Sequence, residues 1–261
     1  MSIDTEHHVR ELNDQGYTVV AQAIAPDELA PIRKAWDRLM DKHVAADPDE
    51  IHVQIKRCLE QDPVFEPLMN WPTTFPIVHN VLGHDVTLLS SGEGDYRAPR
   101  TKAFISWHND FAFLENLPYP RQVFLVRCTY FIDDVTPDMG PFTLLPGSHK
   151  FDHGPPDEMT DADGAAILPA EAVGVTGKAG DCLLNITEIW HTNTPNRSDR
   201  ARKLLMICYK HAWMQPWGDG GNVTDAFAER QTDPVRRQLC GLVAWHSRFK
   251  DVGDWKQLET G

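Results

Sequence analysis

The sequence predicts a mainly β domain with helices at its N-terminal end. From residue 86 onward the chain consists of short apolar segments separated by Gly, Pro and Asp turns, with no helices expected between them. Before that point, apolar residues recur at helical spacing. Many short strands in succession indicate a sandwich or a barrel. Since no internal repeat or linker interrupts the chain, we expect a single domain over residues 1–261.

The N-terminal quarter is expected to cover the sheet with helices. Residues 5–15 predict a short helix that Gly16 ends, and residues 17–20 predict a strand. A stronger helix begins at Pro26, because proline suits the first turn of a helix. Its apolar face repeats at helical spacing through Leu29, Ile32, Trp36, Leu39 and Met40. A further helix is expected over residues 74–82.

Later segments have the composition of strands. They are residues 86–90, 101–108, 122–132, 142–145, 173–176, 182–190 and 203–212. Residues 151–168 are rich in Asp, Gly and Pro and predict a long loop on the rim of the β core. The domain then has three parts: a helical cover over about residues 1–85, a β core over about 86–213 and a C-terminal extension over 214–261.

Composition excludes several classes of partner. The formal charge of −13 makes a nucleic acid an improbable partner. The chain has no apolar run long enough to span a bilayer and no secretory signal, so we expect no membrane partner. The five cysteines have no paired spacing, which favours a reducing, cytoplasmic location and argues against a cysteine metal site.

The most informative motif is His108-Asn109-Asp110 with His191 further along the chain. The triplet follows an apolar-alternating segment, and residues i and i+2 of a strand share a face, so His108 and Asp110 point into the same space. If His191 joins them, two imidazoles and one carboxylate bind one face of a metal. That set suits ferrous iron and leaves positions open for other ligands. Because the chain has 12 histidines, the triplet alone is a weak signal.

The surrounding segments make the motif much more specific. The order is Asp133 to Pro141, Leu145 to Lys150, Trp190 to Ser198, and then Arg202 eleven residues after His191. This ordered set resembles the phytanoyl-CoA dioxygenase family of Fe(II)/2-oxoglutarate oxygenases, over about residues 16–213. The resemblance implies a double-stranded β-helix, which is a jelly-roll, cupin-like barrel. It also implies the cofactor Fe(II) and the cosubstrates 2-oxoglutarate and O2.

The resemblance assigns roles to individual residues. His108, Asp110 and His191 would be the metal ligands and the catalytic centre. Arg202 would bind the far carboxylate of 2-oxoglutarate, because a guanidinium forms a planar two-pronged bond with a carboxylate. Three further residues are expected to contact the cosubstrate: Thr129, Asn193 and Gln54.

The implied reaction is oxidation of a small-molecule metabolite, with 2-oxoglutarate converted to succinate and CO2. Related halogenases have a small residue in place of the carboxylate, so Asp110 favours hydroxylation of an unactivated C–H bond. Desaturation, ring formation and epimerisation stay open. The alternative is a metal-binding cupin-type barrel without 2-oxoglutarate chemistry, such as an isomerase, a direct dioxygenase or a non-catalytic sensor. Arg202 at the expected offset argues against that alternative.

Aromatic residues supply the candidates for the substrate pocket, although aromatics on strands pack in cores more often than they line pockets. The candidates are Tyr96, Phe104, Trp107, Phe111, Phe113 and Trp213, together with His211 on the last strand. They form a mixed apolar set that is compatible with many small molecules.

Overall fold

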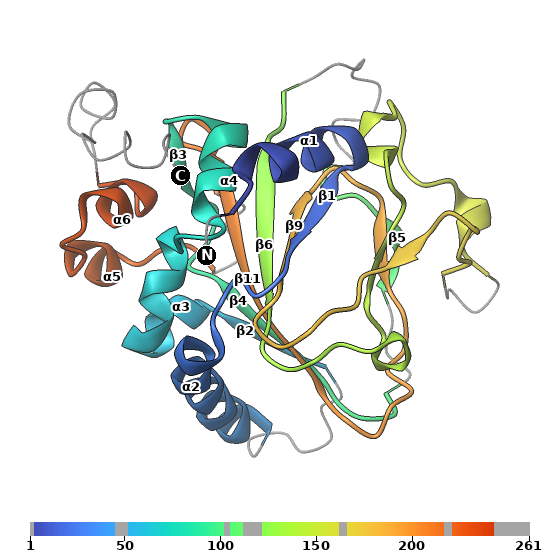
Figure 1. Cartoon of the computed structure of the whole chain (residues 1–261), viewed down its shortest axis with the longest axis horizontal. Coiled ribbons are helices and arrows are strands. Elements are labelled where there is room, and N and C mark those ends of the chain that lie inside the picture. Colours follow the sequence, from blue (N-terminus) through green and yellow to red (C-terminus); the bar gives the residue numbers. More distant parts are fainter. Residues whose placement is uncertain are drawn as a thin grey trace.

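The computed structural model describes residues 3–44, 52–101, 105–111, 122–161, 166–216 and 221–242. Its strands are β1 Tyr17–Val20, β2 His52–Lys56, β3 Val86–Leu88, β4 Glu93–Arg97, β5 Ile105–His108, β6 Leu125–Phe131, β7 Phe142–Leu144, β8 Val173–Gly174, β9 Cys182–Ile186, β10 His191–Asn193 and β11 Arg202–His211. They form two antiparallel sheets (Figure 1). The large sheet has the order β1-β9-β6-β11-β4-β2, with β3 paired to β11, and the small sheet has the order β5-β10-β7-β8.

Helices cover the side of the large sheet that faces away from β5 (Figure 1). The α-helices are α1 Thr5–Gln15, α2 Pro26–Val44, α3 Cys58–Gln61, α4 Phe75–Leu82, α5 Asp225–Glu229 and α6 Pro234–Leu239. The short 3-10 helices are η1 Pro63–Asn70, η3 Pro137–Met139, η4 Ser148–Lys150 and η5 Asp157–Met159. In the part of the chain that the structure describes, none of the helices has the length and apolar character needed to cross a membrane.

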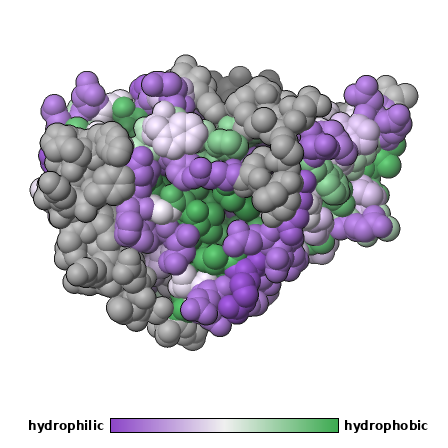
Figure 2. Space-filling model, turned by 90° about the horizontal axis from the view of Figure 1, so that it is seen from above, coloured by the Kyte–Doolittle hydropathy of each residue, from purple (hydrophilic) through white to green (hydrophobic). Residues whose placement is uncertain are grey.

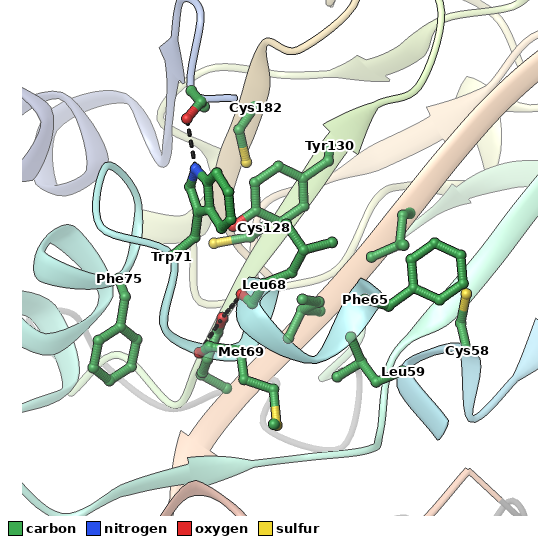
Figure 3. Close-up of a cluster of buried hydrophobic side chains, with 14 of the residues drawn as sticks. Cys58, Leu59, Phe65, Leu68, Met69, Trp71, Phe75, Cys128, Tyr130 and Cys182 are labelled. Atoms are coloured by element: carbon green, nitrogen blue, oxygen red, sulfur yellow. Dashed lines mark hydrogen bonds between the residues drawn. The ribbon is translucent and has the colours of Figure 1, made fainter. Parts of the chain in front are cut away.

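The main hydrophobic core lies between these helices and the large sheet. Figure 3 shows part of it, where Trp71 and Tyr130 lie close together among buried apolar side chains. The indole of Trp71 donates a hydrogen bond to the carbonyl of Ala23 at 2.7 Å, so its one polar atom is satisfied inside the core. Trp36 of α2 packs directly on the backbone of β4, because Gly94 has no side chain there. The helical layer therefore fixes the position of β4.

A second hydrophobic core separates the two sheets. The large sheet contributes Phe131, Leu183 and Leu204 to it, and the small sheet contributes Phe142 and Leu144. Side chains on this inner face alternate with those that face the helices, as the period of two in a strand requires. The inner face is where polar groups can be placed between the sheets.

Figure 2 shows the molecule from above, relative to the view of Figure 1. The face seen there has a central hydrophobic area bordered by hydrophilic side chains. Among the described residues, the exposed large apolar side chains are Phe151, Ile167, Leu168, Trp213 and Leu242. Phe151, Ile167 and Leu168 belong to the segment that the sequence predicts as a rim loop.

The predicted fold class is confirmed, with one difference in the barrel. The structure is mainly antiparallel sheet with N-terminal helices, and α1 and β1 have the predicted bounds. In the described residues, however, the two sheets do not close into a continuous barrel. The expected strand over residues 182–190 is also wrong in part, because β9 ends at Ile186 and the chain turns before β10.

Two strands of the large sheet, β2 and β4, were not predicted. In β4 the inward side chains are charged: Glu93, Asp95 and Arg97. A strand whose interior face is charged does not show the usual alternation of apolar and polar residues, so the pattern hides it. That charged face belongs to the candidate site.

Candidate active site

Three potential metal ligands meet where β5 ends and β10 begins. His108 and His191 are register partners in the antiparallel ladder, and their ring centroids lie 4.1 Å apart. Asp110 follows β5, and its Oδ1 lies 3.8 Å from Nε2 of each histidine. One donor atom from each residue lies within 4.8 Å of the other two, so the group could hold a metal ion. The structure therefore brings together the three residues that the sequence selects.

The backbone fixes which nitrogen of each histidine is available. Nδ1 of His108 donates to the carbonyl of Ser106 at 2.8 Å, and Nδ1 of His191 donates to the carbonyl of Ile189 at 2.8 Å. A carbonyl oxygen only accepts hydrogen bonds, so each Nδ1 carries the proton and each Nε2 keeps its lone pair. Both Nε2 atoms face Asp110, which is the tautomer that metal binding through Nε2 requires.

The protonation states also suit a metal. Burial lowers the pKa of His191 to about 3, so this imidazole is neutral near pH 7. Burial would raise the pKa of the Asp110 carboxyl, but the positive charge of Arg127, together with His191 and His108, holds it below its usual value. Neutral imidazoles and an ionised carboxylate are the forms that bind metals. The donor set consequently fits ferrous iron, which favours nitrogen and hard oxygen ligands.

Arg202 is the second centre of the site, and its guanidinium is held rigidly. The side chain is 1% exposed. It donates from Nη2 to Oδ1 of Asp95 at 2.7 Å, from Nη1 to Oδ1 of Asn193 at 3.0 Å, and from Nη1 to the carbonyl of Gly140. Asn193 lies on the small sheet, so its hydrogen bond with Arg202 joins the two sheets. These contacts fix the plane of the guanidinium.

Asp95 is a buried carboxylate surrounded by cationic groups. Burial would raise its pKa, but Arg202, His52 and Arg97 hold the pKa well below its usual value. His52 Nε2 lies 2.8 Å from Oδ2 of Asp95. Arg97 is fully buried and is the register partner of Arg202. Asp95 therefore stays ionised and keeps Arg202 in place.

Nε of Arg202 and Oγ1 of Thr129 are buried polar atoms of the large sheet that have no hydrogen-bond partner in the described structure. Thr129 of β6 is the register partner of Met206 of β11. Met206 comes four residues after Arg202, so Thr129 and Arg202 face the same side of the sheet. An unpaired buried donor costs about 1–3 kcal/mol, so such atoms indicate a missing partner. A ligand with several acceptor oxygens would satisfy both, and 2-oxoglutarate is such a ligand.

Gln54 is the register partner of Asp95 and faces the same side of the sheet, but its side chain is exposed on β2, the last strand in the order of the large sheet. The residue of β2 that does reach the network is His52, two positions earlier, through Asp95. Sequence reasoning missed His52, Asp95, Arg97 and Arg127, and the signal for two of them was the alternation of charges in β4.

The aromatic candidates for the substrate pocket lie in different places. Phe111 is buried beside Phe124, with ring centroids 5.7 Å apart, and Trp213 lies at the edge of the same group, 6.3 Å from Phe124. His211 stacks on Trp213. Trp107 donates instead to the carbonyl of Ile167. Phe104 and Phe113 fall outside the described residues, and Tyr96 packs on the helical side of the sheet, away from the candidate site.

A second group that could hold a metal, His7, His8 and Glu11, lies on the surface helix α1. Its side chains already bond to one another and to β1, because Thr18 donates to Glu11 and lies 2.7 Å from His8 Nδ1. These contacts attach α1 to the sheet, and nothing else in the group indicates a bound ion.

Several known proteins resemble this chain in sequence. The family model of phytanoyl-CoA dioxygenase (PhyH) matches residues 12–204. L-proline trans-4-hydroxylase of Streptomyces griseoviridis is 25% identical over 181 residues, which cover 61% of this chain and 67% of that protein. The ectoine dioxygenase of Stutzerimonas stutzeri is 24% identical over 234 residues, which cover 78% of this chain and 76% of the relative.

Solved structures share the fold. HygX from Streptomyces hygroscopicus, with nickel and 2-oxoglutarate bound, aligns with a TM-score of 0.68 and 19% identity over 83% of this chain and 90% of that chain. The 2-oxoglutarate-dependent epimerase SnoN from nogalamycin biosynthesis aligns with a TM-score of 0.60 and 20% identity over 80% and 83%. At these identities the alignments show the jelly-roll fold alone. The match of the family model over residues 12–204 goes further: this chain belongs to the phytanoyl-CoA dioxygenase family and is a 2-oxoglutarate-dependent non-haem iron dioxygenase.

Proposed function

We propose that this enzyme hydroxylates an unactivated C–H bond of a small-molecule metabolite. In that reaction one oxygen atom of O2 enters the substrate as a hydroxyl group. The other enters 2-oxoglutarate, which becomes succinate and CO2. The observation that carries the proposal is the convergence of Nε2 of His108, Nε2 of His191 and Oδ1 of Asp110 on one point. The carboxylate argues against halogenation, because it fills the position that a halide ligand would need, and hydroxylation is the reaction we propose among the remaining oxidations.

Each residue of the site has a proposed role. His108, Asp110 and His191 hold Fe(II), and the bound iron supplies the activation of O2. Arg202 and Thr129 receive 2-oxoglutarate with the donors that lack partners in the described structure. Asn193 acts by holding Arg202 rather than by touching the cosubstrate. The exposed side chain of Gln54 gives it no role in this proposal.

The substrate is proposed to be a small metabolite. The relatives support this, since their names specify L-proline and ectoine. The aromatic group around Phe111 and Phe124, which continues to Trp213, supports a substrate with an apolar part near the metal ligands. The alternative of a cupin-type barrel without 2-oxoglutarate chemistry loses its support because the chain belongs to an oxygenase family.

We also propose that residues 1–261 act as one domain in a reducing compartment such as the cytoplasm. One hydrophobic core contains residues from both ends of the described chain, including Leu12 and Leu239. All five cysteines are free thiols in the structure, and four of them are buried.

The test is an anaerobic absorption titration of the metal-free protein with ferrous iron and then 2-oxoglutarate. A weak visible charge-transfer band that requires both additions would support the chelated cosubstrate. Arg202→Ala should require far more 2-oxoglutarate to develop the band. Arg197→Ala is the matched control, because Arg197 is an exposed arginine only five residues earlier, and it should titrate like the wild type. No band at saturating additions would overturn the proposal.

The type of reaction is then tested by product mass. Substrates are screened by release of succinate, and the product of any active substrate is analysed by mass spectrometry. A gain of one oxygen atom supports hydroxylation. A loss of two hydrogens, or an unchanged mass with inverted configuration, would replace hydroxylation with desaturation or epimerisation while leaving the enzyme class intact.

A further inference from the structure

The two oxygens of Asp110 have different partners. Oδ1 lies 3.8 Å from Nε2 of both His108 and His191, and it faces the point where a metal would bind. Oδ2 points away from the histidines and accepts a hydrogen bond from Nη2 of Arg127 at 2.6 Å. The side chains of Asp110 and Arg127 are each 13% exposed, so little water competes for this ion pair. One oxygen of the carboxylate is therefore already bound to the protein.

Arg127 is itself held in place by the large sheet. It lies on β6, between β9 and β11, where it is the register partner of Cys208. Its Nε donates to Sγ of Cys208 at 3.4 Å, while Nη2 donates to Asp110. A guanidinium can serve both acceptors because its donors form a rigid planar fork. The position of Oδ2 thus depends on a strand in the middle of the large sheet.

We propose that Arg127 is a positioning residue that keeps Asp110 a one-oxygen ligand of the metal. This inference rests on the proposed function of the site. Three protein donors would leave one face of an octahedral iron open. A 2-oxoglutarate that chelates the iron would take two of the open positions and leave one for O2. If Asp110 bound through both oxygens, the second oxygen would compete for that last position.

A purely structural role for Arg127 predicts something different. Removing a cation beside a buried carboxylate destabilises the protein, whatever the carboxylate does for a metal. The measurement must therefore respond to the open coordination position of the iron, rather than to the stability or the activity of the protein. Nitric oxide is suitable because it binds ferrous iron where O2 would bind and gives a distinct paramagnetic signal. Its affinity is measured on the anaerobic complex with ferrous iron and 2-oxoglutarate.

Two variants test the proposal. Arg127→Met removes both the charge and the planar set of guanidinium donors at similar volume. Arg127→Lys keeps the charge but loses the planar set of donors. In Arg127→Met we expect ferrous iron to bind up to about 10- to 100-fold more weakly, the range for partners that orient metal ligands, and nitric oxide affinity of the complex saturated with iron and 2-oxoglutarate to fall about 10-fold or more. Arg127→Lys should lose nitric oxide affinity by a smaller factor. Arg33→Met is the matched control, since Arg33 pairs with Asp133 at 3.0 Å on the far side of the large sheet.

The outcomes separate cleanly. Wild-type nitric oxide affinity in a folded Arg127→Met or Arg127→Lys protein would overturn the inference. Loss of iron binding in both variants would overturn it as well, because Arg127 would then hold the ligand set together rather than limit Asp110. If Arg127→Met does not fold, Arg127→Lys decides. If the wild type itself forms no complex with iron and 2-oxoglutarate, the proposed function fails instead, and that result is visible before nitric oxide is added.

Discussion

His191 lies opposite His108 in the ladder between β10 and β5, so backbone pairing sets the separation of the two imidazoles. The register shifts between His191 and Asn193, which marks a local irregularity immediately after the ligand. A metal bound at the proposed site would therefore meet two histidines that are already placed, and only Asp110 comes from the segment after the strand. Preplaced ligands of this kind should make each histidine necessary for iron binding.

Replacing His108 by Ala should abolish tight iron binding. Loss of an outer partner of a metal ligand already costs about 10- to 100-fold in affinity, so loss of a ligand should cost more. Ferrous iron affinity is measured anaerobically by competition with a coloured chelator. His153→Ala is the control, because His153 is exposed on the rim loop. Wild-type affinity in His108→Ala would contradict the assigned site.

Replacing Arg202 by Lys should raise the KM for 2-oxoglutarate and leave iron affinity unchanged. Lysine keeps the charge but cannot bond Asp95, Asn193 and a carboxylate in one plane. The loss of a charged hydrogen bond, about 1.5–3 kcal/mol, corresponds to about 10- to 100-fold in KM. Steady-state kinetics with varied 2-oxoglutarate give the value. An unchanged KM would show that another residue anchors the cosubstrate.

Replacing Asp95 by Asn should weaken both the fold and the cosubstrate site. Removing one partner of a buried ion pair costs about 3–5 kcal/mol. The pKa of Asp95 is held below its unfolded value, so its stabilisation is complete above about pH 5 and is lost as the pH falls through and below the unfolded pKa of about 3.9. The wild type should therefore exceed Asp95→Asn in stability at pH 7, and the gap should narrow towards pH 3. Urea unfolding measures the difference, and a constant gap would contradict the assignment.

His79 should make the fold sensitive to mild acid. Burial and the neighbouring His84 lower the pKa of His79 to about 4. The unfolded chain has a histidine pKa of about 6.5, so it binds this proton first and stability falls from about pH 6.5 to pH 4. His79→Phe should unfold with a weaker dependence on pH over that window. Equal dependence in the two proteins would exclude His79 as the source.

Replacing Gly94 by Ala should displace Asp95 of the candidate site, although the clash with Trp36 occurs on the opposite face of the sheet. A Cβ there would lie 2.2 Å from Cη2 of Trp36, so β4 or α2 must move. Overpacking of this kind costs about 1–3 kcal/mol. Because Asp95 follows Gly94, the KM for 2-oxoglutarate should rise as well. Adding Trp36→Phe, which removes the clashing atoms, should restore the melting temperature and the KM, and failure to restore either would exclude the packing explanation.

The sequence predicted the parts of the site that carry a local signal. The spacing of His108 and Asp110 follows from strand geometry, and the structure brings His191 to them. Arg202 could be selected because its chemistry and its offset agree. Arg127 had no such signal, because its importance lies in a contact with Asp110 from another strand. Asp95 had only the alternation of charges in β4, which does not reveal its contact with Arg202. Gln54 illustrates the converse: it shares a face of β2 with His52 and is the register partner of Asp95, but its side chain is exposed on the last strand in the order of the large sheet.

The arrangement of the two sheets also bears on the length of the cosubstrate that the proposed site accepts. The proposed metal ligands His108 and His191 belong to the small sheet, whereas Arg202 and Thr129 belong to the large one. If 2-oxoglutarate spans the two sheets as proposed, the apolar side chains packed between the sheets set the distance between the two ends of its site. A bulkier or smaller residue in that layer would shift the preference towards a longer or a shorter 2-oxo diacid. Cosubstrate choice could change in this way with every binding residue intact.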